Sequence, residues 1–201
     1  MMAGGMIPYE FNAERFSRWV AYVLRHNPER YGLEPDRHGF VDYDAFLQIA
    51  ARRYPGLDAE RLRELVESGG AARFEVAGGR LRARYGHSIP VEPVGPPVEP
   101  PPALYYGIDA DRAESLLSDG LAPADRRMLH LSTAVDEALA IARRKTERPA
   151  VLHVDAEAAH RAGVAFYREG AVYLADRIPA TFLRLEPLPA SLSSAPPSEP
   201  V

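Results

Sequence analysis

The chain has 201 residues, of which 46% are hydrophobic, enough for one large domain or two small lobes with modest cores. It contains no cysteine, which excludes disulfides, thiolate zinc sites and a cysteine nucleophile, and its net charge of −4 argues against a general nucleic-acid coat protein. The N-terminus lacks the features of a signal peptide, and no segment is long and apolar enough to span a membrane. We therefore expect a soluble, cytoplasmic protein.

Charge is unevenly distributed along the chain. Residues 1–88 carry 13 arginines and 12 acidic residues, a net +1, whereas residues 89–201 carry 11 basic and 16 acidic residues, a net −5. A polyanion is therefore expected to bind the first half. Lys145 is the only lysine beside 23 arginines, so an arginine is weaker evidence for phosphate recognition here than in a chain of ordinary composition.

The first predicted helix runs from about Glu14 to His26. Apolar residues recur along it at helical spacing, which predicts one buried face. Arg25 and His26 fall in its last turn, where the helix dipole favours cations, and Pro28 prevents the helix from continuing. Taken alone, the Arg-His pair is explained by the dipole and does not require a binding site.

A short strand at Gly39-Phe40-Val41 and two capped helices are predicted next. Asp42 is a suitable N-cap for a helix over 43–53, and Asp58 for a second helix that Gly69-Gly70 ends. The predicted buried stripe of this second helix consists of Leu62, Leu65 and Val66.

A hairpin follows, with strands over 73–76 and 81–85 on either side of a Gly78-Gly79 turn. A two-residue loop there places Phe74, Val76, Leu81 and Ala83 on one face and Arg73, Glu75, Arg82 and Arg84 on the other. Glu75 can neutralise Arg82. Arg73 opposite Arg84 is a like-charge pair that either holds an anion or extends into water. Helices followed by a hairpin predict a winged-helix-like lobe.

Seven prolines between residues 90 and 102 predict an extended connector. Beyond it, short apolar strands alternate with helices, so the expected fold class is α+β with two lobes. The predicted strands centre on 104–106, 129–131, 151–154, 172–174 and 182–185, and the predicted helices cover 110–118, 135–144 and 156–162. We expect Gly120 to end the first of these helices and Ser132 or Thr133 to cap the second. The predicted divisions are a lobe over 10–89, the connector 90–102, a lobe over 103–187 and a disordered tail over 188–201.

Common catalytic signatures are missing from the sequence. It has no phosphate-binding glycine loop, no metal-ligand spacing and no serine-elbow motif, so we expect no metal. Four other stretches occur in order: Val23 to Pro28 with Gly32 to Val41, Arg73-Phe74-Glu75 with Leu81 to Pro90, Leu104 to Gly107, and Arg126 to Ser132. Together they resemble the motifs of the NAD-dependent RNA 2′-phosphotransferases, the tRNA-splicing enzymes and their archaeal and bacterial relatives. The run RARYGHSIP is close to the archaeal form.

The resemblance implies a winged-helix lobe followed by an NAD-binding lobe of the ADP-ribosyltransferase type. The implied substrates are an RNA that bears an internal 2′-phosphate and NAD as co-substrate, with no metal and no obligate protein partner. In the implied reaction the 2′-phosphate attacks the nicotinamide ribose and expels nicotinamide. The neighbouring hydroxyl of that ribose then attacks the ADP-ribosylated phosphate, which releases the RNA and ADP-ribose 1″,2″-cyclic phosphate.

The resemblance also assigns roles to residues. The implied catalytic group is Arg25, His26, Arg73 and Arg126, with the arginines clamping the 2′-phosphate and the histidine hydrogen-bonding it or handling a proton. The implied NAD-binding residues are Tyr105, Tyr106, Gly107, His130 and Ser132, although a helix cap would also explain Ser132. The implied RNA-binding residues are Arg82, Arg84, His87 and Ser88, although a structural role is an alternative for His87.

Tyr106 and Ile108 depart from the resemblance, because the family usually has histidine and threonine at these positions. The departure leaves two further interpretations open. One is an NAD-dependent ADP-ribosyltransferase that modifies the phosphate ends of nucleic acids, and the other is an inactive module that binds phosphate or RNA.

Overall fold

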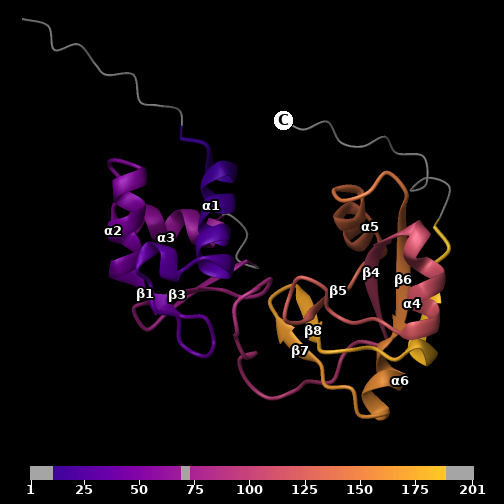
Figure 1. Ribbon diagram of the computed structural model, residues 1–201. Helices are drawn as coiled ribbons and strands as arrows, with labels where there is room; N and C mark the ends of the chain where they lie inside the picture. Colours follow the sequence, from indigo (N-terminus) through magenta and orange to yellow (C-terminus); the bar gives the residue numbers. More distant parts are fainter. Residues whose placement is uncertain (1–10, 69–72, 189–201) are drawn as a thin grey trace, which may run out of the picture. The chain divides into compact units, whose positions relative to one another are not determined.

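The computed structural model describes residues 11–68 and 73–188, and its fold is mixed α+β with two antiparallel sheets (Figure 1). The α+β part of the predicted fold class is therefore confirmed. The chain divides into two compact units between Ala83 and Arg84. This division comes before the proline-rich segment, because residues 85–87 make hydrogen bonds and a ring contact within the second unit.

The first unit combines three α-helices, one short 3-10 helix and a sheet of order β1-β3-β2. Its elements are α1 (Ala13–His26), η1 (Glu29–Tyr31), β1 (Val41–Asp42), α2 (Tyr43–Arg53), α3 (Ala59–Ser68), β2 (Phe74–Ala77) and β3 (Arg80–Ala83). One core joins them, and its fully buried members include Phe16, Phe46, Leu62 and Leu81. The predicted stripe of α3 is buried in this core.

Side chains cap α2 and α3 as predicted. The Asp42 carboxylate accepts a 2.8 Å hydrogen bond from the Ala45 N–H, and the Asp58 carboxylate accepts one of the same length from the Arg61 N–H. Each bond satisfies a backbone donor that the first turn of a helix leaves open. The predicted terminator Gly69-Gly70 lies outside the described residues.

The β2–β3 hairpin has the predicted register. Phe74 pairs with Ala83, Glu75 with Arg82, Val76 with Leu81, and Ala77 with Arg80. The four apolar side chains of the hairpin all pack in the core of the unit. The paired strands end at Phe74 and Ala83, so the expected pairing of Arg73 with Arg84 lies just beyond them and stays a prediction.

The second unit is built on an antiparallel sheet of order β7-β8-β5-β4-β6-β9. Its strands are β4 (Ala103–Asp109), β5 (Leu129–Ser132), β6 (Pro149–Asp155), β7 (Tyr167–Glu169), β8 (Val172–Ala175) and β9 (Leu183–Leu185). Its helices are η2 (Ala110–Arg112), α4 (Ala113–Asp119), α5 (Val135–Arg143), α6 (Ala156–Arg161) and η3 (Ala180–Phe182). The sequence predicted these elements except β7, η3 and the split of 110–118 into η2 and α4.

The two faces of this sheet are covered by different helices. Leu104, Ile108 and Leu152 share a core with residues of α4 and α6, while Val151 on the opposite face packs against Ala138 and Leu139 of α5. The ribbon shows α5 lying against the sheet (Figure 1). Alternation along β4 therefore decides which side chains meet which helix.

One predicted cap is wrong. The N-cap of α5 is Ala134, which makes no side-chain capping bond, so neither Ser132 nor Thr133 caps the helix. Ser132 is instead the last residue of β5, where cross-strand pairing with Tyr105 and Val172 fixes it. Gly120 ends α4 as expected. Among the helices of residues 11–68 and 73–188, none is long and apolar enough to cross a membrane.

Candidate active site

The first group of predicted site residues lies at the end of α1. Arg25 and His26 occupy its last turn, and the Asn27 N–H closes the helix by bonding to the Val23 carbonyl oxygen at 3.3 Å. The Nε and Nη2 atoms of Arg25 are buried. The guanidinium of Arg25 therefore belongs to the last turn of α1, where the partial negative charge of the helix dipole favours a cation.

Arg73 is tied to the same helix by a weaker bond. Its Nη1 atom lies 3.4 Å from the Oγ atom of Ser17, a buried residue of α1. Ser17 precedes Arg25 by about 12 Å along the helix axis. The structure thus brings Arg73 to the helix of Arg25 and His26 but toward its first half.

Arg82, a predicted RNA-binding residue, has a different environment. Its side chain is only 3% exposed, and its Nη2 and Nε atoms contact the Glu75 carboxylate at 2.6 and 2.8 Å. The guanidinium also lies over the Phe40 ring, 5.0 Å from the ring centroid. The predicted Glu75–Arg82 pair is confirmed. These partners supply the compensation that a buried charge needs, which favours a structural role.

A second group of site residues meets within the second unit. The Nη1 atom of Arg126 donates a 2.7 Å hydrogen bond to the Gly86 carbonyl oxygen, and the Arg127 N–H donates one of 3.2 Å to the His87 carbonyl oxygen. The rings of Tyr85 and His130 lie 5.7 Å apart. The segment 84–88 is therefore held against the start of β5, and folding joins two motifs that are distant in sequence.

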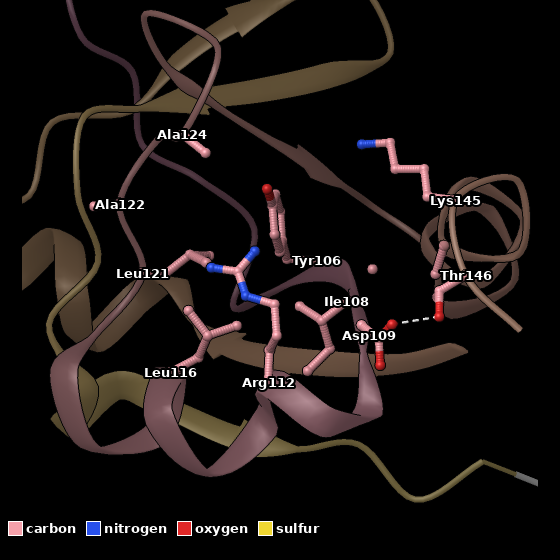
Figure 2. A pocket seen from close by; sticks show the side chains of 12 residues that line it. Tyr106, Ile108, Asp109, Arg112, Leu116, Leu121, Ala122, Ala124, Lys145 and Thr146 are labelled. Atoms are coloured by element: carbon pink, nitrogen blue, oxygen red, sulfur yellow. Dashed lines mark hydrogen bonds between the residues drawn. The ribbon is translucent and has the colours of Figure 1, made fainter. Parts of the chain in front are cut away.

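A cavity of about 240 Å³ opens beside β4 in the second unit. Figure 2 shows Tyr106 at its centre, Arg112 of η2 extending toward the tyrosine, and Lys145 at the far side. The remaining wall comes from Gly107, Ile108, Asp109, Leu116, Leu121, Ala122, Ala124, Ala142 and Thr146. Its lining thus combines an aromatic ring, two cationic side chains and apolar groups.

Electrostatics in this cavity keep Tyr106 neutral. Burial raises the pKa of its hydroxyl, and the positive charges of Arg112 and Arg126 offset this only in part. At the edge of the cavity the Thr146 hydroxyl donates a short hydrogen bond to Asp109 (Figure 2), and this bond together with one from the Asp111 N–H lowers the pKa of Asp109. Tyr106 can therefore act as a neutral hydrogen-bond donor in this cavity.

Comparison with known proteins decides the family. The family model for RNA 2′-phosphotransferases, the Tpt1 / KptA family, matches residues 12–176. A probable RNA 2′-phosphotransferase of Thermococcus kodakarensis is 37% identical over 86% of this chain and 96% of its own length. One of Streptomyces coelicolor is 38% identical over 85% and 93%, and one of Archaeoglobus fulgidus is 32% identical over 90% and 84%. The chain belongs to the RNA 2′-phosphotransferase family.

The side chains of the predicted NAD-binding residues do not all point to one face of the sheet. Tyr105 pairs with Ser132 across β4 and β5, so these side chains share a face, and His130 and Gly107 follow on the same face by alternation. The side chain of Tyr106 points to the opposite face, into the cavity, which Gly107 also lines. A ligand flat against the sheet contacts the side chain of Tyr105 or of Tyr106, but not both.

Gly107 has a packing requirement of its own. A Cβ atom at this position would lie 2.2 Å from the Ala138 carbonyl oxygen of α5. Only glycine therefore lets α5 approach β4 this closely. This contact explains the glycine without a ligand, and its predicted NAD-binding role stays a prediction.

The sequence did not predict a binding role for several residues of this cavity. Arg112, Asp109, Lys145 and Thr146 come from the end of β4, from η2 and from the segment after α5. No spacing in the sequence joins these segments, and only the pairing of β4 with β6 brings them together. The only local pattern among these residues is Asp109-Ala110-Asp111, which is typical of the start of a helix and does not indicate a binding site.

Proposed function

We propose that the chain removes an internal 2′-phosphate from RNA and transfers it to NAD, with release of nicotinamide and ADP-ribose 1″,2″-cyclic phosphate. Membership of the RNA 2′-phosphotransferase family supports the RNA part of this proposal. The observation that supports the phosphate site is the hydrogen bond from Arg126 to the Gly86 carbonyl oxygen. This bond links the motif that contains Arg126 to the motif that contains Gly86. We further propose that the first unit is a winged-helix-like lobe and the second an ADP-ribosyltransferase-like lobe.

Arg25, Arg73 and Arg126 are proposed to bind the 2′-phosphate. A guanidinium stays charged throughout the reaction and offers five N–H donors in one plane, which suits a phosphate dianion that must not be protonated. The bond to Gly86 uses one donor of Arg126 and restricts the orientation of the group. Positioning of this kind also stabilises charge that develops on the phosphoryl oxygens.

His26 is proposed to complete the phosphate site. Its ring lies 6.3 Å from the Tyr22 ring one turn earlier on α1, which limits its orientation. In the neutral form one ring nitrogen donates and the other accepts, so the residue can hydrogen-bond a phosphate oxygen or take up a proton.

The cavity at Tyr106 is proposed to hold one nucleoside end of NAD. Its volume of about 240 Å³ is below the ~300–1,000 Å³ typical of sites that enclose a whole drug-sized ligand, so only part of a dinucleotide fits inside. The Tyr106 ring offers a stacking surface, and Arg112 and Lys145 offer charge for a pyrophosphate. When bound, NAD supplies the ribose carbon that accepts the phosphate and nicotinamide as leaving group.

The test is incubation of the protein with NAD and a short RNA that bears one internal 2′-phosphate. The proposal predicts free nicotinamide, dephosphorylated RNA and ADP-ribose 1″,2″-cyclic phosphate in equal amounts. A stable ADP-ribosylated RNA would instead show that the chain is an ADP-ribosyltransferase. Binding of the RNA without consumption of NAD would overturn the proposed reaction.

A further inference from the structure

A second, larger cavity lies in the same unit. It has a volume of about 530 Å³, and its wall includes Pro93, Arg127, Met128, Val164, Tyr167 and Arg177. The loop 121–128 lines the first cavity with Leu121, Ala122 and Ala124, and this one with Arg127 and Met128. Neither the sequence motifs nor the proposed phosphate site uses Tyr167 or Arg177.

The two arginines of this cavity stand on a fixed backbone. Leu121 and Ile178 exchange two backbone hydrogen bonds of 2.8 and 2.9 Å, which anchor the segment that carries Arg177. The other end of the loop is anchored by the bond from the Arg127 N–H to His87. The backbone that carries each of the two arginines is therefore held by hydrogen bonds close to the arginine.

The charges of this cavity select a ligand of mixed polarity. Within residues 11–68 and 73–188, the side chains of Arg127 and Arg177 form no ion pair and no hydrogen bond, so both can bind an anion. Asp176 also lines the cavity, and its carboxylate disfavours a ligand that is purely anionic. A nucleotide satisfies both conditions, because it joins a phosphate to a base whose amino groups donate hydrogen bonds.

The remaining wall suits a base. Tyr167 is partly buried, and with Met128, Val164 and Pro93 it forms an apolar surface in the cavity. Unstacked RNA bases are commonly bound by stacking on aromatic side chains. The volume of about 530 Å³ lies within the ~300–1,000 Å³ typical of sites for ligands the size of a nucleotide.

We propose that this cavity binds the RNA nucleotide joined to the 2′-phosphorylated one, with its base on Tyr167 and its phosphate on Arg127 and Arg177. The proposal rests on the proposed function, because Arg126, which would hold the 2′-phosphate, directly precedes Arg127. Arg126 and Arg127, which are consecutive in the loop, would then contact consecutive nucleotides of one RNA strand. The cavity would thus make the enzyme prefer an internal 2′-phosphate over one on an isolated nucleotide.

The site can be tested without the reaction, by fluorescence anisotropy with a labelled RNA hexamer that lacks the 2′-phosphate, in the absence of NAD. Tyr167→Ala is expected to weaken binding roughly 5- to 100-fold, whereas Tyr167→Phe keeps the stacking surface and binds like the wild type. Arg177→Gln is expected to reduce the slope of log K against log salt by about 0.7, the value for one phosphate contact on a single strand.

Arg168→Gln is the matched control. Arg168 is exposed and follows Tyr167 on β7, so its side chain points to the other face of the sheet. Equal effects of Arg177→Gln and Arg168→Gln on the salt slope would overturn the site, as would equal binding by the alanine and phenylalanine variants of Tyr167. Wild-type binding with no turnover of 2′-phosphorylated RNA would contradict the proposed function and leave the cavity assignment standing.

A kinetic test follows for an active protein. The ratio of kcat/KM for a 2′-phosphorylated hexamer to kcat/KM for a 2′-phosphorylated mononucleotide is expected to fall about tenfold in Tyr167→Ala, since only the hexamer reaches the cavity. An unchanged ratio would contradict the proposal.

Discussion

The Nη1 atom of Arg126 donates a 2.7 Å hydrogen bond to the carbonyl oxygen of Gly86, 40 residues earlier in the chain. The bond orients an exposed guanidinium that the side chain alone would leave free to rotate. It also means that Gly86, His87 and Arg126 keep one arrangement inside the second unit. Preorganisation of this kind makes a charged donor effective in catalysis, because little reorganisation is needed during the reaction.

Arg126→Lys is expected to lower kcat by about 10²–10³, the usual loss for one preorganised donor, without lowering the unfolding temperature. Lysine keeps the charge but cannot bond Gly86 and a phosphate through one planar group. Single-turnover assays with 2′-phosphorylated RNA and NAD measure the effect. Arg144→Lys, at an exposed arginine after α5, is the control and should match the wild type. Near wild-type turnover in Arg126→Lys would exclude Arg126 from the phosphate site.

Tyr106→Phe is expected to weaken NAD binding roughly 2- to 10-fold, the effect of one lost neutral hydrogen bond. The raised pKa of the Tyr106 hydroxyl keeps it protonated at neutral and mildly alkaline pH, so the difference between the two proteins should stay constant from pH 6 to pH 9. Isothermal titration calorimetry with NAD measures it. Tyr22→Phe, on the exposed face of α1, is the control. Identical NAD affinity in Tyr106→Phe and wild type would show that the Tyr106 hydroxyl does not bind NAD.

The sequence predicted the local geometry of the first unit well because local rules govern it. The cap at Asp42, the stripe of α3 and the hairpin register depend on residues within a few positions of one another. The motifs also predicted the family, and its model matches residues 12–176.

The cavity around Tyr106 could not be predicted in the same way. Arg112, Leu121 and Thr146 meet only after β4 pairs with β5 and β6, and no local pattern encodes that pairing. Arg82 illustrates the opposite difficulty. The motif that contains Arg82 indicated RNA binding. In the structure its side chain is buried and paired with the Glu75 carboxylate, and a sequence motif describes neither property.

Gly107→Ala is expected to destabilise the protein by about 1–3 kcal/mol or more, because the new methyl group meets backbone that cannot move aside without separating α5 from β4. Chemical denaturation followed by circular dichroism measures the loss. Gly56→Ala is the matched control, since Gly56 has a φ of 87° but nothing within 4 Å of an added Cβ atom. The control isolates backbone strain, which costs about 1 kcal/mol. A smaller loss in Gly107→Ala than in Gly56→Ala would contradict the steric account.

A double-mutant cycle on Arg82 and Glu75 separates structure from RNA binding. Arg82→Ala is expected to cost about 3–5 kcal/mol in the free energy of unfolding, since it removes one member of a buried ion pair. Glu75→Gln in the Arg82→Ala background should recover part of this loss, because it removes the carboxylate charge that Arg82 no longer compensates. If Arg82→Ala keeps full stability and loses only RNA affinity, the structural role is wrong.

Asp36→Asn tests a pH-dependent contribution in the first unit. Burial raises the pKa of Asp36, but hydrogen bonds from the Phe40 and His38 N–H groups and the charge of Arg80 outweigh it, so the net pKa is lowered. A carboxyl whose pKa is lowered on folding stabilises the protein above its unfolded value of about 3.9, and this stabilisation is lost as the pH falls through the folded value. The substitution should therefore cost about 1–2 kcal/mol at pH 7, since three hydrogen bonds lose their ionic acceptor.

Denaturation of wild type and Asp36→Asn between pH 7 and pH 2 measures this contribution directly. The difference in unfolding free energy should be constant down to about pH 4 and shrink below it, as the wild-type carboxyl takes up a proton. Asp125→Asn, at an exposed loop residue, is the control and should change stability at pH 7 by less than about 0.5 kcal/mol. A difference that grows on acidification would reverse the sign of the linkage and show that Asp36 is destabilised by its surroundings.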